Sequence, residues 1–451
     1  MLGAAAAAFV AAIILFVSRD DTQRTAPPAT EGASAVSAAP NAASTAGETS
    51  SGDVAAGGET NIPFTIDTAT VAYFAAAPGC TATGLEWAVE DSAGAQISTT
   101  NVICDDIGRV ELPAPGEYRV RVFSDGTGAG GAFSFVRQTS RVDRILNIAS
   151  GQAVEGNIDL PGAQDFYDFS VAAGTIAYFA SDGCSAPGPQ WTIETDTGSA
   201  ASGGAIICDD LGRVEFADAG SYRVRVFSTA GSTGSYKLAW KTSRPDRTLP
   251  ISSGQTVTGE TDLPGAQDVY EFDVEAGVVA YFAADPACSQ DDRYWLVENA
   301  DNSAVSHSSG MCSDLGRVAF ATAGRYHVRI AANDGATGHY AFTWVTSRPD
   351  RSRELTVGST SSGTIDVPGS QDTWTFSAEQ GQSVTFTADP GCDTDGLLWV
   401  VLAADGTAIT PPSLVCDDIG SVTVPANGEY QIVVSGDGAA TGDYSFSAAP
   451  G

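Results

Sequence analysis

The spacing of the eight cysteines constrains this 451-residue chain more than any other feature. Four pairs occur, the two members of every pair are the same distance apart, and the pairs recur at a constant interval. Such regularity is typical of one unit copied in tandem. Eight cysteines allow many connectivities, but a copied unit predicts four local disulfides: Cys80–Cys104, Cys184–Cys208, Cys288–Cys312 and Cys392–Cys416. Bridges in every copy indicate an oxidising compartment outside the cytoplasm.

The segments around the cysteines have the pattern of β-strands. In "YRVRV" (Tyr118–Val122) apolar and charged residues alternate, as in a strand with one buried face. "VAYFAA", "IAYFAS" and "VTFTAD" are further β-rich runs, and Gly-rich segments separate the last two strands of each copy. Many short strands with frequent turns predict an all-β fold, a β-sandwich or a barrel, and the copied unit predicts four tandem disulfide-containing domains of this kind, which we expect to be β-sandwiches.

The copies set the expected domain boundaries. The four repeats should occupy residues 52–144, 145–247, 248–351 and 352–451, joined by the copied linkers "TSRVDR", "TSRPDR" and "TSRPDR". Short linkers, two of them with proline, favour stiff joints. The first repeat is incomplete, because it has "AAGGETN" where the others have "DLPGAQD", "DLPGAQD" and "DVPGSQD".

The N-terminal segment has a different composition. Residues 1–19 contain the apolar run "LGAAAAAFVAAIILFV" with no basic residue before it, and "SRDD" follows directly. We therefore expect an uncleaved transmembrane anchor and not a cleaved signal peptide. Residues 20–51 are rich in Ala, Ser, Thr, Gly and Pro, which predicts a flexible stalk.

The formal net charge is -33, from 55 acidic against 22 basic residues. So large an acidic excess argues against nucleic-acid binding, because a phosphate backbone would be repelled. It is compatible with a strongly solvated surface, with divalent-cation binding or with a salt-rich surrounding.

The repeats resemble bacterial pre-peptidase C-terminal (PPC-like) domains. The resemblance rests on "SGQAVEGNIDLPGAQDFYDFSVAAG" with "DAGSYRVRVFS" in repeat 2, and on "SGQTVTGETDLPGAQDVYEFDVEAG" with "TAGRYHVRI" in repeat 3. It covers nearly all of residues 52–451. The resemblance implies a jelly-roll-like sandwich on secreted or surface proteins, accessory to catalysis and not itself catalytic. The regular disulfide departs from the usual family pattern.

The most conspicuous candidate site is the recurring "CDDxGRV". Three interpretations stay open: a disulfide-anchored turn in which one aspartate caps backbone N–H groups, a calcium site, and a loop that binds a partner. In the second, the ligands would be Asp106, Asp210, Asp314 and Asp418, with Asp105, Asp209 and Asp417 assisting. Ser313 replaces the assisting acid in repeat 3. A zinc site is not expected, because histidine occurs only in repeat 3.

Other candidates are weaker. Asp165, Asp268 and Asp372 of the "GAQD" and "GSQD" segments could cap a loop or bind calcium. One tryptophan follows the first cysteine of each pair at a fixed distance, which favours packing on the disulfide over sugar stacking: Trp87, Trp191, Trp295 and Trp399. His307, His327 and His339 have no counterparts in the other repeats, and no hydrolase or phosphate-binding motif occurs.

These observations together predict a non-enzymatic protein, anchored in a membrane with its bulk outside the cell, that serves adhesion or ligand binding to a protein or glycan. A structural spacer and the sensor ectodomain of a receptor are the alternatives. No cofactor is expected, apart from the calcium considered above.

Overall fold

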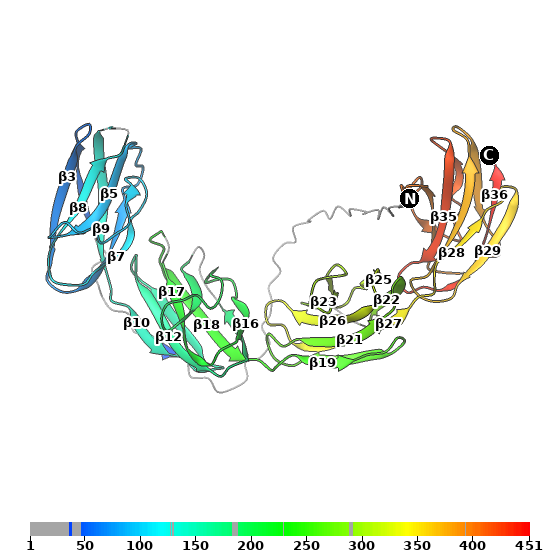
Figure 1. Ribbon diagram of the computed structural model, residues 1–451, viewed down its shortest axis with the longest axis horizontal. Coiled ribbons are helices and arrows are strands. Elements are labelled where there is room, and N and C mark those ends of the chain that lie inside the picture. The colour runs from blue at the N-terminus through cyan, green and yellow to red at the C-terminus, as the bar shows by residue number, and fades with distance from the viewer. Residues whose placement is uncertain are drawn as a thin grey trace. The chain divides into compact units, whose positions relative to one another are not determined.

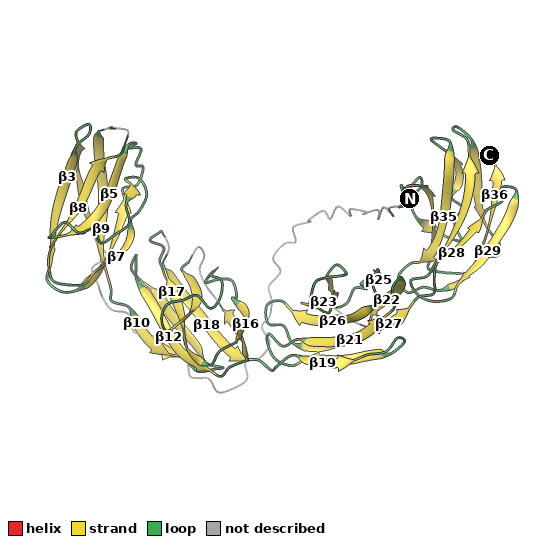
Figure 2. Ribbon diagram, viewed as in Figure 1, coloured by secondary structure: helices red, strands yellow, loops and turns green. Residues whose placement is uncertain are grey.

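The computed structural model describes residues 36–37, 47–126, 128, 130–182, 188–228, 230–287, 292–392 and 394–451. All regular elements in these ranges are β-strands, as Figure 2 shows by colour. Many of these strands have one apolar face and bury every second side chain; β8, for example, buries Tyr118, Val120 and Val122. Others are apolar on both faces, such as β4, which buries residues 71–74 in succession.

The strands recur in the same order in each repeat. Repeat 1 holds β2 (Glu48–Val54), β3 (Glu59–Ile66), β4 (Thr70–Ala76), β5 (Leu85–Asp91), β6 (Asn101–Val102), β7 (Gly108–Leu112), β8 (Gly116–Ser124) and β9 (Gly131–Ser140). Repeat 2 holds β10 (Arg144–Asn147), β11 (Ala153–Ile158), β12 (Gln164–Val171), β13 (Thr175–Ser181), β14 (Gln190–Thr195), β15 (Ala205–Ile206), β16 (Gly212–Phe216), β17 (Gly220–Phe227) and β18 (Gly234–Thr242).

Repeats 3 and 4 repeat this order. Repeat 3 holds β19 (Arg247–Pro250), β20 (Thr256–Thr261), β21 (Asp268–Val274), β22 (Val278–Ala284), β23 (Arg293–Asn299), β24 (Ser309–Gly310), β25 (Gly316–Phe320), β26 (Gly324–Ala332) and β27 (Gly338–Thr346). Repeat 4 holds β28 (Arg351–Glu354), β29 (Ser359–Ile365), β30 (Gln371–Ala378), β31 (Ser383–Ala388), β32 (Leu397–Ala403), β33 (Ser413–Leu414), β34 (Gly420–Thr423), β35 (Gly428–Gly436) and β36 (Gly442–Pro450).

Each repeat contributes two sheets. In repeat 1 the strand orders are β2-β9-β4-β7 and β3-β8-β5-β6, and the later repeats keep this order. The linkers add an edge strand, because β10, β19 and β28 pair in parallel with β12, β21 and β30. β10 lies beside β12 in Figure 1. A further short strand, β1 (Val36–Ser37), lies within the predicted stalk and pairs in parallel with β11. β2 also begins before residue 52.

Each repeat has a hydrophobic core with one tryptophan fully enclosed. The exposure of the side chains is 0% for all four: Trp87, Trp191, Trp295 and Trp399. In repeat 2 the rings of Phe169 and Trp240 lie 4.8 Å apart between centroids, and Ile193, Val224 and Val226 fill the remaining space. Burial of apolar area at about 25 cal/mol per Å² is the main stabilising contribution of such a core.

The prediction of four separate jelly-roll-like β-sandwich domains is wrong. The described residues contain no helix, and residues 1–19, the expected anchor, lie outside them. Residue contacts divide the chain into two compact units and not four, one with most of repeats 1 and 2, the other with most of repeats 3 and 4. The physical reason is that the linkers are strands of the following sheets, so no free connector separates neighbouring repeats. This organisation is closer to a solenoid-type repeat array, in which each repeat is stabilised by its neighbour.

Candidate functional site

The second aspartate of "CDDxGRV" binds the protein itself in every repeat. Asp106 accepts hydrogen bonds from the Tyr73 hydroxyl at 2.8 Å and from the Ala76 N–H at 2.8 Å. Asp210 and Asp314 have the equivalent tyrosine partners, Tyr178 at 2.8 Å and Tyr281 at 2.6 Å. Burial and the neighbouring carboxylate raise the pKa of the Tyr73 and Tyr281 hydroxyls well above the usual value. These tyrosines therefore stay protonated donors to the aspartates.

Repeat 4 keeps only half of this arrangement. Asp418 accepts the N–H of Ala388 at 2.8 Å. Thr385 stands where the other repeats have a tyrosine, as the strand registers Tyr73↔Arg109 and Thr385↔Ser421 show.

The first aspartate of the motif contributes a backbone group. The indole N–H of Trp87 donates to the carbonyl of Asp105 at 3.0 Å, and Trp191 and Trp399 bond Asp209 and Asp417 in the same way. In repeat 3 the acceptor is the carbonyl of Ser313, also at 3.0 Å. Because the acceptor is a backbone carbonyl, the bond does not depend on the side chain, and Ser313 can therefore stand where the other repeats have an aspartate.

The disulfides hold this motif against a second loop. Cys80 is bonded to Cys104, and Cys392 to Cys416, as the spacing predicts. Cys208 and Cys312 are also disulfide-bonded; their predicted partners, Cys184 and Cys288, lie outside the described residues. The tryptophans lie in the core beside these loops and not on the surface.

The aspartates of "GAQD" and "GSQD" are fully buried ion-pair partners. Asp165 bonds the guanidinium of Arg141 at 2.6 Å and that of Arg144 at 2.6 Å, and it accepts the hydroxyl of Tyr236 at 2.5 Å. Tyr236 in turn lies 2.8 Å from the hydroxyl of Tyr167. Burial raises the pKa of Tyr167 to about 12 and that of Tyr236 well above the usual range.

The same cluster recurs in the later repeats. Asp268 pairs with Arg247 at 2.7 Å and accepts the hydroxyl of Tyr340. Asp372 pairs with Arg348 at 2.6 Å and accepts the hydroxyl of Tyr444 at 2.8 Å. The arginine partners were not predicted from the sequence. The copied "TSRxDR" was the available signal, because an arginine that recurs at the same place in every linker is expected to have an equivalent partner in each repeat.

Linker aspartates pair in the opposite direction along the chain, toward the preceding repeat. Arg109 of repeat 1 bonds Asp143 at 2.9 Å and the carbonyl of Gly162 at 2.7 Å. Burial raises the pKa of the Asp143 carboxyl, and the charge of Arg109 opposes this shift. Arg317 of repeat 3 likewise bonds Asp350 at 2.5 Å. The first and third linkers thus carry charge pairs to both of the repeats that each of them joins.

The histidines lie apart from these clusters. His327 Nε2 lies 3.4 Å from Glu271, and His339 Nε2 lies 3.8 Å from Glu260. His307 is exposed. Within the described ranges there is no group of three or more His, Cys, Asp or Glu side chains arranged to hold a metal ion. The aspartates named as calcium ligands are separate single carboxylates, each with protein donors.

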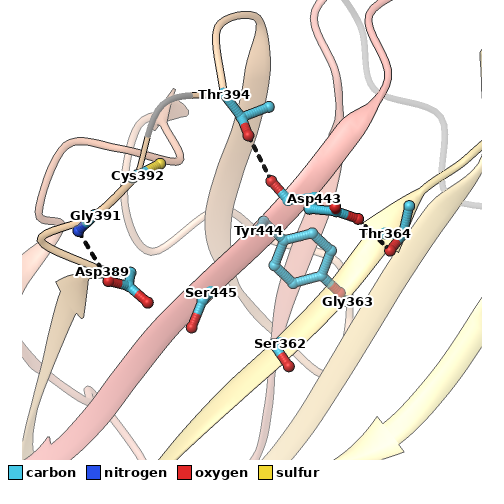
Figure 3. A pocket seen from close by; sticks show the side chains of 10 residues that line it. All are labelled: Ser362, Gly363, Thr364, Asp389, Gly391, Cys392, Thr394, Asp443, Tyr444 and Ser445. Atoms are coloured by element: carbon cyan, nitrogen blue, oxygen red, sulfur yellow. Dashed lines mark hydrogen bonds between the residues drawn. The ribbon is translucent and has the colours of Figure 1, made fainter.

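Open hollows occur at equivalent places in repeats 1 and 4. In repeat 4 a hollow of about 380 Å³ lies between the Cys392 loop and strands β29 and β36 (Figure 3). Its polar lining includes Ser362, Asp389 and Ser445. Thr394 on the rim donates to the carbonyl of Asp443 at 2.7 Å. In repeat 1 a hollow of about 540 Å³ lies between residues 77–83 and 130–134.

In the part of the chain that the structure describes, no element is a helix of the length and apolarity needed to cross a membrane. The predicted anchor, residues 1–19, is outside that part.

The fold and the site define a disulfide-containing all-β repeat protein. No family model matches the chain, and no curated protein does. A solved structure of Aeromonas hydrophila PliG, a periplasmic lysozyme inhibitor of g-type lysozyme, is 9% identical over 23% of this chain and 97% of that one, with a TM-score of 0.20. Lac15 from a marine microbial metagenome is 10% identical over 66% of this chain and 86% of its own, with a TM-score of 0.12. Similarity at these TM-scores supports no argument about this chain, and the resemblance to PPC-like domains stays a prediction.

Proposed function

We propose that the chain is a non-enzymatic repeat protein that works outside the cytoplasm and presents disulfide-braced loops at a cell surface for adhesion or ligand binding. The observation that supports this most is the recurrence of an open hollow beside the first cysteine of the pair in repeats 1 and 4. Residues 1–19 as an anchor remain part of the proposal, followed by a tether that ends before β1 (Val36–Ser37).

The use of the charged side chains supports a non-enzymatic role. The aspartates that the sequence singles out accept hydrogen bonds from tyrosines, arginines and backbone N–H groups of the same chain. A catalytic acid or base needs reach to a substrate proton, whereas Asp165, Asp268 and Asp372 are fully buried.

The lining of the hollows indicates the class of ligand. Hydroxyls, backbone groups and the carboxylates of Asp389 and Asp443 surround the space in repeat 4. Together with the net charge of -33, this favours a neutral or cationic polar ligand, such as a glycan or a basic peptide, over an anionic one.

The test is binding of the whole chain to arrays of glycans and of basic peptides. Ser362→Tyr places a large ring into the hollow, whereas Thr360→Tyr puts the same ring on an exposed position two residues earlier in β29. We expect Ser362→Tyr to weaken binding at least tenfold and Thr360→Tyr to leave it unchanged. No binding of the wild type, or equal binding of both variants, would contradict a role for this hollow.

A structural spacer is the second candidate, and the charge pairs of the linkers favour it. Arg109–Asp143 and Arg144–Asp165 fix one linker to the repeats on both sides. A spacer should tolerate Ser362→Tyr and lose function when a repeat is deleted, so the two candidates give opposite results.

A further inference from the structure

One face of repeat 1 contacts a turn of repeat 2. The tyrosine and arginine of this face pack closely against a glycine of the turn. Tyr73 and Arg109 are cross-strand neighbours on β4 and β7. Gly162 lies against them, since a Cβ at Gly162 would be 3.3 Å from Tyr73 Cδ2 and 3.6 Å from Arg109 Cβ. Its φ of +76° also requires glycine.

The same contact recurs further along the chain. Within the unit of repeats 1 and 2, which includes Leu263–Gly265, Arg213 bonds the carbonyl of Gly265 at 3.1 Å. Tyr178 lies against Gly265 as Tyr73 does against Gly162.

In the unit of repeats 3 and 4, Arg317 bonds Gln371 at 2.6 Å. A Cβ at Gly369 would lie 2.9 Å from Tyr281 Cβ. A second loop of repeat 4 approaches the same face, because a Cβ at Gly438 would lie 3.6 Å from both the Tyr281 hydroxyl and Asp314 Oδ2.

The contact has two halves, the Tyr–Arg face of one repeat and the Pro-Gly turn of the next. In the described chain, each half is missing from the repeat that has no neighbour to meet it. Repeat 4 has Thr385 and Ser421 at the positions of the tyrosine and the arginine. Repeat 1 has no Pro-Gly turn, because only Ala55–Gly58 connect β2 with β3. Repeats 2 and 3 have both halves.

We propose that the Tyr–Arg face is a docking surface for the Leu/Val-Pro-Gly turn of a following repeat, and that its distribution prevents copies of this chain from joining head to tail. The partner must be a repeat whose turn has a glycine with a positive φ and, beside it, a carbonyl or amide oxygen that can accept a hydrogen bond from the arginine. The "CDD" aspartate positions the tyrosine ring of this face and is not itself a ligand-binding group. This inference does not depend on the proposed function.

The first test compares two glycines of repeat 4 in the whole chain. Gly369→Ala and Gly381→Ala put the same strain on the backbone, with φ of +76° and +80°, but only Gly369 has a neighbouring repeat within 4 Å. We expect Gly369→Ala to lower the melting temperature of repeat 4 by at least about 5 °C more than Gly381→Ala does. Equal shifts would overturn the docking role of the turn.

The second test transplants the docking face. Tyr281→Thr/Arg317→Ser frees the turn of repeat 4, and Thr385→Tyr/Ser421→Arg builds a face on the same repeat. The chain with all four substitutions then carries a free turn and a free face, and we expect its sedimentation coefficient to rise with concentration.

The controls are the two double variants, Tyr281→Thr/Arg317→Ser and Thr385→Tyr/Ser421→Arg. Each should sediment like the wild type. A quadruple variant that melts like the Tyr281→Thr/Arg317→Ser double variant and still sediments like the wild type would overturn the proposal. The melting comparison shows whether the four substitutions disturb folding beyond the loss of the joint.

Discussion

At the scale of single residues, two adjacent aspartates of one motif have different roles. Asp209 presents its carbonyl to Trp191 at 3.0 Å, so its carboxylate is not needed for that bond. Asp210 uses both carboxylate oxygens, one for Tyr178 and one for the N–H of Ser181. The capping interpretation predicted a backbone N–H partner but not the tyrosine, because nothing local in the sequence brings β13 to the motif.

We predict that Asp210→Ala destabilises the protein by about 2–4 kcal/mol, because two hydrogen bonds to a charged acceptor are lost and a part-buried tyrosine hydroxyl is left without its partner. Asp209→Ser, the substitution that repeat 3 already carries at Ser313, should change stability by less than about 0.5 kcal/mol. Urea unfolding followed by tryptophan fluorescence measures both. A larger effect at Asp209 than at Asp210 would refute the assignment of roles.

The buried tyrosines predict a loss of stability in alkaline solution. Burial raises the pKa of Tyr167 to about 12 in the folded state, against about 10 in an unfolded chain. The unfolded state therefore releases its protons first, and the stability present below about pH 10 decreases as the pH rises toward about 12. Ultraviolet absorbance of tyrosinate and circular dichroism should change together. Ionisation of all tyrosines near pH 10 in an intact fold would contradict this.

At the scale of elements, the sequence predicts what is periodic and local. The strand alternation of Tyr118–Val122 is found in β8, and the two disulfides that can be described in full have the predicted partners. The separate-domain prediction is wrong because it treated "TSRVDR" as a connector. Arg144 instead begins a strand and pairs with the buried Asp165. Composition and strand periodicity do not predict that pairing, and the repeated "TSRxDR" indicates only that the arginine matters, not which acid 21 residues further along the chain it bonds.

The disulfide loop gives a prediction for the hollow of repeat 4. The bridge Cys392–Cys416 closes a loop of sequence separation 24, which the chain-entropy model values at about 3–4 kcal/mol. Cys392→Ser/Cys416→Ser should lower the free energy of unfolding by about this amount and increase hydrogen exchange at Gly391 and Thr394, which line the hollow. The equivalent loop of repeat 1 serves as the internal control. Unchanged exchange at Gly391 and Thr394 would show that the bridge does not hold this wall of the hollow.

At the scale of the whole molecule, the net charge of -33 means that the repeats carry an excess of carboxylates, which repel one another. The described residues pair many of their arginines with acids, as in Arg348–Asp366 and Arg119–Glu90, but acidic residues exceed basic ones by more than two to one. The negative charge of the carboxylates is therefore far from neutralised by basic side chains. The mutual repulsion of the carboxylates destabilises the compact state until salt screens it.

We predict that the melting temperature rises between about 0.1 M and about 1 M sodium chloride, because the Debye length shrinks from about 10 Å to about 3 Å. Millimolar calcium, compared with EDTA at constant ionic strength, should produce no further rise, since the carboxylates of Asp106, Asp210 and Asp314 each already accept two hydrogen bonds. Asp210→Ala provides the control, because it removes one candidate calcium ligand and leaves nearly all of the net charge. A calcium-dependent rise in the wild type that Asp210→Ala reduces would instead assign these aspartates as metal ligands. A melting temperature that rises with sodium chloride but not with calcium, equally in the wild type and in Asp210→Ala, would show that the acidic surface responds to ionic screening and does not bind the metal.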